Sequence, residues 1–167
     1  GPATGFGGDN TPYFFGRLAS DTVITRNTLT KVTSMTNSEI DTDSAFDGTT
    51  FTVPSGEGGK YFIQGTVTGD YSDIGQDGEE TVASIYKNGS SIQLATIRNS
   101  STVTGTGRVI TTVASTIQDL SASDTIELYA LTTDASGDNA KVVITLPVPV
   151  AELLVLIVAS WIEEPFL

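Results

Sequence analysis

The stretch FDGTTFTVPSGEGGKYFIQGTVT, residues 46–68, decides the fold class of this sequence. Two runs rich in Thr, Val, Ile and aromatic residues, Phe46–Val53 and Lys60–Thr68, flank a turn of Pro, Ser and Gly at residues 54–59. In the second run the odd-numbered and even-numbered residues alternate in character, with the period of two that gives a strand two different faces. We therefore expect two strands joined by a tight turn.

Strand-like runs separated by turn residues continue on both sides of this stretch. Val82–Lys87 and Ser90–Arg98 flank Asn88-Gly89, the strongest short-range hairpin signal, because both turn residues tolerate positive φ. Ser34–Ser44 is polar and predicts a surface loop. The other predicted strands are Tyr13–Ser20, Thr22–Thr33, Val109–Ile117, Thr125–Thr132 and Ala140–Thr145.

Helical signals are weak throughout the sequence. No long stretch repeats apolar residues at the helical spacing of about 3.6 residues, and Gly occupies 17 scattered positions. About eight short strands with turn signals between them are typical of an antiparallel sandwich or jelly roll. The sequence therefore predicts an all-β fold.

Length and charge limit the classes of function. A chain of 167 residues forms one domain, or one domain with a tail. The absence of Cys and His removes disulfides, thiol nucleophiles, the Ser-His-Asp triad and the commonest transition-metal ligand. With 20 acidic and 8 basic residues, the net charge of −12 disfavours nucleic-acid partners and anionic membrane surfaces. We expect no nucleic-acid binding and no membrane insertion.

Four segments, taken in order, resemble the complement C1q-like globular head, which shares its fold with tumour-necrosis-factor-like domains. They cover about Tyr13 to Val143, and one difference is that Ser123 stands where glycine is usual. The matching segments are Tyr13–Leu18, the run 46–54 with 59–62, Tyr86–Gly89 and Ser121–Leu128.

The resemblance implies a ten-stranded antiparallel jelly-roll sandwich that assembles as a homotrimer. Such heads commonly cap collagen-like stalks or fibres, and they bind without catalysing a reaction. Aromatic residues on separate predicted strands exceed what one thin sandwich needs, so they are expected in the core or at the trimer interface. These residues are Phe51, Tyr61, Phe62, Tyr86 and Tyr129.

The function predicted on this basis is a non-enzymatic head domain that acts in attachment or assembly. The acidic, cysteine-free composition favours a phage or bacterial fibre protein at the virion surface or outside the cell. Its expected partners are two further copies of itself and a cell-surface receptor, a glycan or another virion protein.

An acidic loop, Gly69–Glu80, leaves a metal hypothesis open. The carboxylates of Asp70, Asp73 and Asp77 could bind Ca²⁺, which takes about six to eight oxygen ligands. Their spacing matches no EF-hand, so a solvated loop is the alternative. If the loop binds Ca²⁺, a monomeric calcium-dependent carbohydrate-binding jelly-roll module becomes the second candidate function.

A carbohydrate-active enzyme is the third class of function. It requires two carboxyl groups about 5–10 Å apart across one cleft. The acids of this sequence cluster in predicted loops, and Asp47 and Glu127 are nearly the only ones in predicted strands. We therefore expect no enzymatic activity.

The sequence divides into three parts by composition. Residues 1–11 are Gly-rich and predict a flexible N-terminal segment or the remnant of a purification tag, and residues 12–145 form the head. Residues 146–167 form an apolar tail that departs from the family pattern. Its longest apolar run is far shorter than the roughly 20 residues of a transmembrane helix.

The tail has two interpretations. One is a buried strand or an arm exchanged between copies, because an exposed apolar tail favours association. The other is a frameshift, since the family closes its fold with a strand similar to "serine-glycine-phenylalanine-leucine" that is missing here. If the codons from Pro149 to Trp161 are read one base earlier, the permitted translations include TGSGTSSTYSGFL, which resembles that strand.

Overall fold

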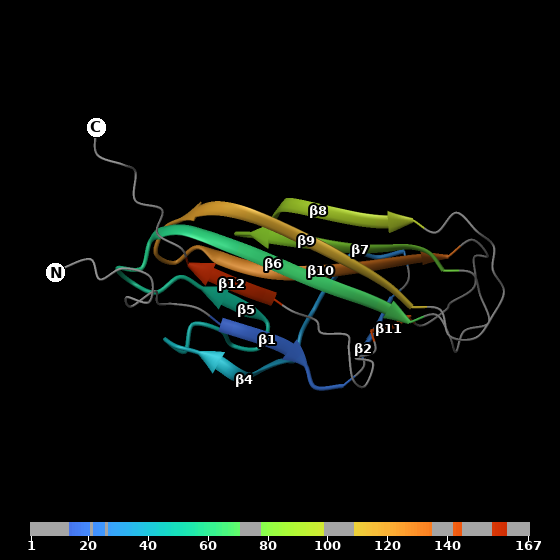
Figure 1. Cartoon of the computed structure of the whole chain (residues 1–167), viewed down its shortest axis with the longest axis horizontal. Helices are drawn as coiled ribbons and strands as arrows, with labels where there is room; N and C mark the ends of the chain where they lie inside the picture. The colour runs from blue at the N-terminus through green and yellow to red at the C-terminus, as the bar shows by residue number, and fades with distance from the viewer. Residues whose placement is uncertain are drawn as a thin grey trace.

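The computed structural model describes residues 14–20, 22–25, 27–70, 78–98, 109–134, 142–144 and 155–159. These residues contain strands and turns but no helix. Figure 1 shows the long strands running along the long axis of the molecule. The strands are β1 (Phe14–Leu18), β2 (Thr22–Ile24), β3 (Thr30–Lys31), β4 (Met35–Asp41), β5 (Thr50–Thr52), β6 (Gly59–Asp70), β7 (Gly78–Lys87), β8 (Ser90–Arg98), β9 (Val109–Leu120), β10 (Thr125–Asp134), β11 (Val142–Ile144) and β12 (Val155–Ala159).

The strands form two antiparallel sheets. The first has seven strands in the order β2-β11-β6-β12-β1-β4, and β9 pairs with β6. Its longest ladder joins β6 to β9, from Gly59 opposite Leu120 to Asp70 opposite Val109. The second has five strands in the order β3-β10-β7-β8, and β5 also pairs with β10. This arrangement confirms the predicted all-β, antiparallel jelly-roll class.

The core lies between the sheets and follows the strand period. On β10, Ile126, Leu128 and Ala130 are buried, whereas the residues between them are only half-buried. The sheets approach closely at Gly65, where a Cβ atom would lie 2.5 Å from Leu128 Cδ1. Glycine at this position therefore allows the β6 backbone to meet a leucine of the opposite sheet.

The two ends of the core differ in composition. At the end where Gly59 pairs with Leu120, which we call the aromatic end, Phe14 stacks on Phe46 at 4.3 Å and on Phe51 at 5.0 Å between ring centroids. The ring centroid of Tyr61 lies 6.0 Å from that of Phe51. The other end, where Asp70 pairs with Val109, buries Thr81, Thr112 and Thr132, and we call it the threonine end.

Thr22–Thr33 is not one strand, contrary to the sequence prediction. Its beginning forms β2 in the first sheet, and its end forms β3 in the second. Between them Asn27 has a φ of 54°, and its N–H donates to Thr132 O at 2.9 Å. Asparagine tolerates this left-handed conformation, so the chain can turn from one sheet to the other.

The loop predicted for Ser34–Ser44 was also wrong. Met35–Asp41 forms β4, which pairs with β1 at the border of the first sheet. Met35 is buried, and its N–H donates to Gly48 O at 2.7 Å. A border strand pairs on one side only and can carry polar residues, which hid this strand from a search for apolar alternation.

Phe46–Val53 was predicted as a continuous strand, but only Thr50–Thr52 forms β5. The Asp47 carboxylate accepts the N–H groups of Thr49 and Thr50 at 2.8 and 2.7 Å. Gly48 follows with a φ of 90°. The segment therefore makes a tight turn, because aspartate bonds to the backbone two and three residues ahead.

The predicted apolar tail contributes a strand to the middle of the first sheet. β12 pairs with β6 from Leu156 opposite Gln64 to Ala159 opposite Tyr61, and it pairs with β1 on its other side. Figure 1 shows β12 between these two strands. Residues 1–13, 145–154 and 160–167 lie outside the described residues, as does most of the predicted acidic loop.

Candidate functional site

Among the described residues, three surface features stand out beside the core: an apolar strip, a polar cluster and a pair of linked turns. The apolar strip lies on the outer face of the first sheet. Val113 and Ile117 of β9 are 47% and 61% exposed, although the alternate residues Thr112 and Ala114 are buried. Ile117 pairs with Phe62 of β6, which is half-buried. Val113 and Ile117 share this face with Ser115 between them, and with Phe62 they make the strip a candidate contact surface.

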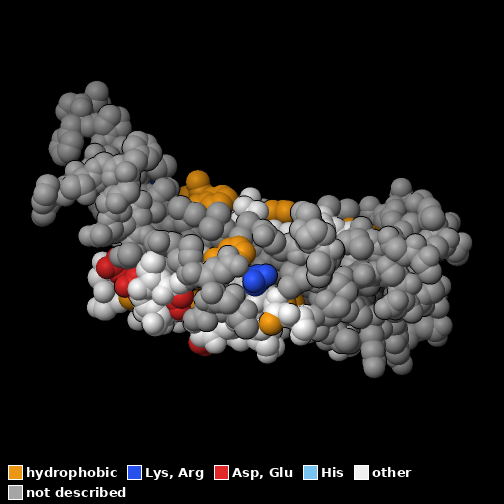
Figure 2. Space-filling view, turned by 60° about the horizontal axis from the view of Figure 1, so that its bottom comes forward, with side chains coloured by type: hydrophobic (Ala, Val, Ile, Leu, Met, Phe, Trp, Pro, Cys, Tyr) orange, Lys and Arg blue, Asp and Glu red, His pale blue; other side chains and the backbone are white. Residues whose placement is uncertain are grey.

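A third exposed large apolar residue lies on the second sheet. Leu94 of β8 is 53% exposed, and strands β8 and β9 lie side by side at the border of the sandwich. In Figure 2, hydrophobic side chains reach the surface in separate groups, and acidic side chains gather toward one end. The described part of the molecule therefore exposes large apolar side chains on both sheets.

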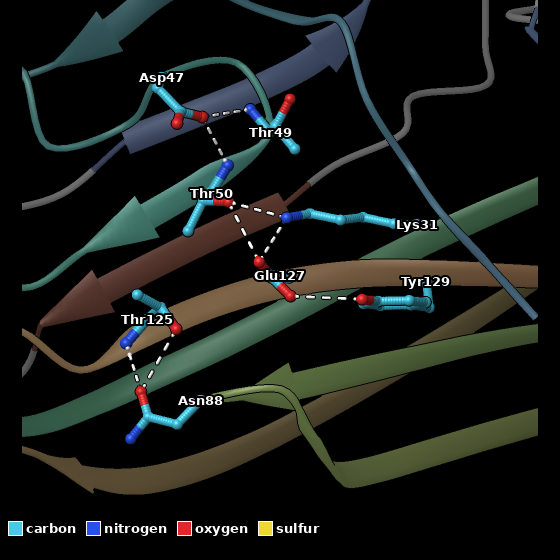
Figure 3. Close-up of polar contacts among 8 residues, drawn as sticks. All are labelled: Lys31, Asp47, Thr49, Thr50, Asn88, Thr125, Glu127 and Tyr129. Carbon is cyan, nitrogen blue, oxygen red and sulfur yellow. Dashed lines mark hydrogen bonds and ion pairs between the residues drawn. The ribbon is translucent and has the colours of Figure 1, made fainter.

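The polar cluster lies on the outer face of the second sheet, where three strands meet (Figure 3). Lys31 Nζ donates to Glu127 Oε1 and, at 3.1 Å, to Thr50 Oγ1. Thr50 Oγ1 donates to the same glutamate oxygen at 3.2 Å, and Tyr129 OH reaches Glu127 Oε2 at 3.5 Å. These contacts tie β3 and β5 to β10. Since the carboxylate of Glu127 is only 13% exposed and its oxygens have partners, the cluster is a structural tie between strands.

Tyr129 also stacks on Tyr86, with ring centroids 3.9 Å apart and planes 26° from parallel. Burial, and to a lesser extent the negative charge of Glu127, raises the pKa of Tyr129. Both rings are half-buried on the outer face of the second sheet. By contrast, Phe51 and Tyr61 lie in the core and Phe62 lies beside the apolar strip.

The linked turns join the β7–β8 hairpin to the turn between β9 and β10. Asn88 Nδ2 donates to Asp124 Oδ1 at 2.7 Å, and Asn88 Oδ1 accepts the N–H of Thr125 at 2.8 Å. Figure 3 shows the second of these contacts. Asp124 Oδ2 accepts Lys87 Nζ at 2.9 Å and the N–H of Ser121 at 2.8 Å. We call Lys87, Asn88, Asp124 and Thr125 the turn clasp.

The turn clasp joins two of the segments that resemble the C1q-like head, Tyr86–Gly89 and Ser121–Leu128. Asn88 and Gly89 have φ values of 51° and 78°, which confirms the predicted hairpin turn. Hydrogen bonds from Asn88, then from Ser121 and Lys87, lower the pKa of Asp124 from 3.8 to about 2. Because the folded pKa is depressed, the stability contributed by Asp124 is present above about pH 4 and is lost as the pH falls toward 2.

The proposed calcium ligands fall largely outside the described residues. Asp70 ends β6, whereas Asp73 and Asp77 belong to the undescribed segment 71–77. Within the part of the chain that the structure describes, no three metal-binding side chains gather. The calcium hypothesis stays a prediction.

A cavity of about 10 Å³ lies between the sheets and is lined mainly by apolar residues, including Phe14, Ile63 and Leu128. This volume is at the lower limit for a single water molecule. Among the described residues, no helix has the length and apolar character needed to cross a membrane.

The sequence prediction missed Val113, Ile117 and Leu94, although a signal for two of them was present. Val113 and Ile117 share odd-numbered positions with the polar residues Ser115 and Asp119. Large apolar residues within an otherwise polar strand face mark a contact surface once the buried face is known. The prediction had considered only aromatic residues.

No protein-family model and no curated protein matches this sequence. Among solved structures, the chain is similar to Eiger TNF from S. frugiperda, with a TM-score of 0.56, 10% identity, and coverage of 94% of this chain and 99% of that chain. It is also similar to the globular domain of zebrafish complement 1qA protein, with a TM-score of 0.49, 10% identity, and coverage of 78% of this chain and 100% of that chain. The first likeness confirms the predicted jelly-roll fold of the TNF-like type.

Proposed function

We propose that this chain is a homotrimeric, non-enzymatic head domain of a fibre or surface protein, acting in attachment or assembly at a virion or cell surface. The observation that carries the proposal is the exposed apolar strip on β9. Val113 and Ile117 lie 47% and 61% exposed on one strand face, beside the half-buried Phe62. Burying such side chains against another copy removes apolar surface from water, which favours assembly.

The positions of the exposed residues favour a ring over a two-fold dimer. A two-fold interface uses the same patch on both partners, whereas a cyclic trimer joins two different patches on each copy. Leu94 lies on the second sheet and Ile117 on the first, on neighbouring border strands. In the proposed trimer, the border with Leu94 packs against the apolar strip of the next copy.

Binding at the surface fits this chain better than catalysis. The Lys31–Glu127 pair is engaged in a tie between strands, with Thr50 and Tyr129 as further partners of the glutamate. A net charge of −12 favours neutral or basic partners, such as glycans or receptor proteins, over nucleic acid. The proposed source is a phage or bacterial fibre, which an upstream stalk sequence would support.

Light scattering on the purified chain at micromolar concentration tests the assembly. We expect three times the mass of one chain. A monomer mass would overturn the trimer and favour the calcium-dependent carbohydrate-binding module. That alternative predicts a rise in melting temperature with millimolar Ca²⁺, lost in a variant with Asp70→Asn and Asp73→Asn.

Matched variants test the interface. Val113→Asp with Ile117→Asp should give folded monomers, because carboxylates would be buried without partners in the trimer. Thr52→Asp is the control, because it places a carboxylate on an exposed position of β5 in the second sheet. If the Thr52→Asp variant dissociates and the β9 variant stays trimeric, the assigned interface is wrong.

A further inference from the structure

Asn88-Gly89 is the one Asn-Gly pair in the sequence. Both polar atoms of the Asn88 side chain make hydrogen bonds. Asn88 Nδ2 donates to Asp124 Oδ1 at 2.7 Å, and Asn88 Oδ1 accepts from Thr125 N at 2.8 Å and from Thr125 Oγ1 at 3.3 Å. The backbone N–H of Asn88 donates to Thr125 O at 3.1 Å. The asparagine amide is thus aimed at the neighbouring turn.

Asn-Gly is also the dipeptide most prone to spontaneous loss of the side-chain amide. The backbone nitrogen of the glycine attacks Cγ of the asparagine, the bond from Cγ to Nδ2 breaks, and ammonia leaves. A cyclic imide remains, and water opens it to an aspartate or an isoaspartate. Glycine favours the attack because it has no side chain to hinder the approach or restrict the backbone.

We propose that Asn88 is a deamidation site that the folded turn clasp protects, and that its conversion irreversibly opens the clasp. Water is the only co-reactant. Attack requires the Asn88 side chain to turn back toward the nitrogen of Gly89. In the folded chain the hydrogen bonds to Asp124 and Thr125 oppose that rotation. The amide is therefore lost mainly when the clasp opens.

The product cannot restore the clasp. Loss of Nδ2 replaces a donor by a carboxylate oxygen, which would face Asp124 Oδ1 at the former distance of 2.7 Å. Two like charges at this separation repel, and Lys87 is the cation that contacts Asp124. An isoaspartate would also add a methylene to the main chain, in a turn where positions 88 and 89 have φ values of 51° and 78°.

Asn27 provides an internal comparison. It shares the left-handed conformation, with a φ of 54°, but a β-branched residue, Thr28, follows it. The crowded neighbour hinders attack on the Asn27 side chain. We expect Asn88 to react before Asn27 once the chain is unfolded, and the difference identifies the glycine as the cause.

The test follows the full chain in warm neutral buffer by peptide mass mapping, with isoaspartate detected by its enzymatic methylation. A synthetic peptide of residues 82–96 gives the unprotected rate. We expect the folded chain to lose the Asn88 amide more slowly than the peptide, and Asp124→Ala to accelerate the loss about tenfold by removing one charged hydrogen-bond partner.

Ile63→Val is the matched control, because it lowers the stability of the buried core without contacting the clasp. The two variants are compared at urea concentrations that give equal free energies of unfolding. Acceleration in the Asp124→Ala variant alone supports local opening. Equal rates in the two variants, or equal rates in folded chain and peptide, would overturn the protection.

A second measurement tests the consequence for the clasp. The aged, deamidated chain and the Asn88→Asp variant should both melt below the untreated protein. An unchanged melting temperature in both would show that conversion leaves the clasp intact, and this part of the proposal would be wrong.

Discussion

The two ends of the sandwich use different chemistry to fill the space between the same two sheets. At the aromatic end, Phe14, Phe46, Phe51 and Tyr61 pack ring against ring. At the threonine end the inward residues are short and carry hydroxyl groups, and Thr112 Oγ1 donates to Thr81 O at 2.9 Å. One end therefore depends on the burial of large apolar surfaces and the other on individual hydrogen bonds.

The stability of the fold is therefore unevenly distributed. A buried aromatic ring contributes several kcal/mol, whereas a hydrogen bond contributes about 1 kcal/mol net. The aromatic end is also the end closed by the turn clasp, because β7 ends and β10 begins there. We expect the threonine end to open first under denaturing conditions.

The largest effect is expected from removing the central ring of the aromatic end. Phe51→Ala should lower the free energy of unfolding by about 3–5 kcal/mol, because the ring is fully buried between Phe14 and Tyr61. Thr112→Ala at the other end should cost about 1 kcal/mol. Urea unfolding measures both, and Phe51→Leu replaces the alanine variant if that variant does not fold. Equal falls in the free energy of unfolding in the two variants would show that the aromatic end is no more stable than the threonine end.

A pH effect is expected at the aromatic end. Burial, followed by the negative charges of Glu57 and Asp43, raises the pKa of Tyr61 from 10.0 to about 12. Because the pKa is raised in the folded state, the contribution of Tyr61 to the free energy of unfolding is fully present below pH 10. It is lost as the pH rises through about 12. The loss is at most about 3 kcal/mol. Tyr61→Phe should remove this part of the alkaline transition, and an unchanged transition would contradict it.

The same substitution at two buried threonines should have opposite effects. Thr132 Oγ1 is buried without a hydrogen-bond partner, so Thr132→Val should raise the free energy of unfolding by about 1 kcal/mol. Thr112→Val removes the bond to Thr81 O and should lower it by about 1 kcal/mol. Thermal and urea unfolding of the two variants provide the measurement. If both variants have a lower free energy of unfolding, both hydroxyl groups have hydrogen-bond partners and the prediction is wrong.

The smallest expected effect concerns a turn at the aromatic end. Ser123 has a φ of 72°, a conformation that costs a residue with a Cβ atom about 1–2 kcal/mol. Ser123→Gly should therefore stabilise the chain by up to about 1 kcal/mol, after the greater entropy loss of glycine on folding. Ser55, an exposed turn residue without positive φ, is the control, and Ser55→Gly should give no gain. If both variants are more stable than the original chain, the left-handed conformation of Ser123 is not the cause of the gain.

The sequence predicted the elements whose signals are local. The Asn88-Gly89 hairpin and the long strands of the two sheets follow from turn chemistry and the period of two. Prediction failed where tertiary contacts decide the conformation. β4 is polar and depends on β1 for its pairing. The turn at Asp47 is a local signal that the prediction overlooked, because the carboxylate accepts the N–H groups of Thr49 and Thr50.

The candidate site was predicted less well than the fold. Among the aromatic residues expected in the core or at the trimer interface, Phe51 and Tyr61 lie in the core. Tyr86 and Tyr129 stack on the outer face of the second sheet, and their place in an interface stays a prediction. Aliphatic exposure on β9 can be recognised only when the buried face is known. The frameshift hypothesis stays a prediction, which the nucleotide sequence from Pro149 to Trp161 would decide.

The position of β12 has a consequence for how the chain folds during synthesis. β1 pairs with β4 and β12, and β12 is the last of the described strands to leave the ribosome. Until it emerges, the nascent chain presents the β6 backbone from Tyr61 to Gln64 as an open edge, in a molecule that already holds its other long strands. Open edges pair with other chains, so the interval before Val155–Ala159 arrives is when chaperone protection matters most.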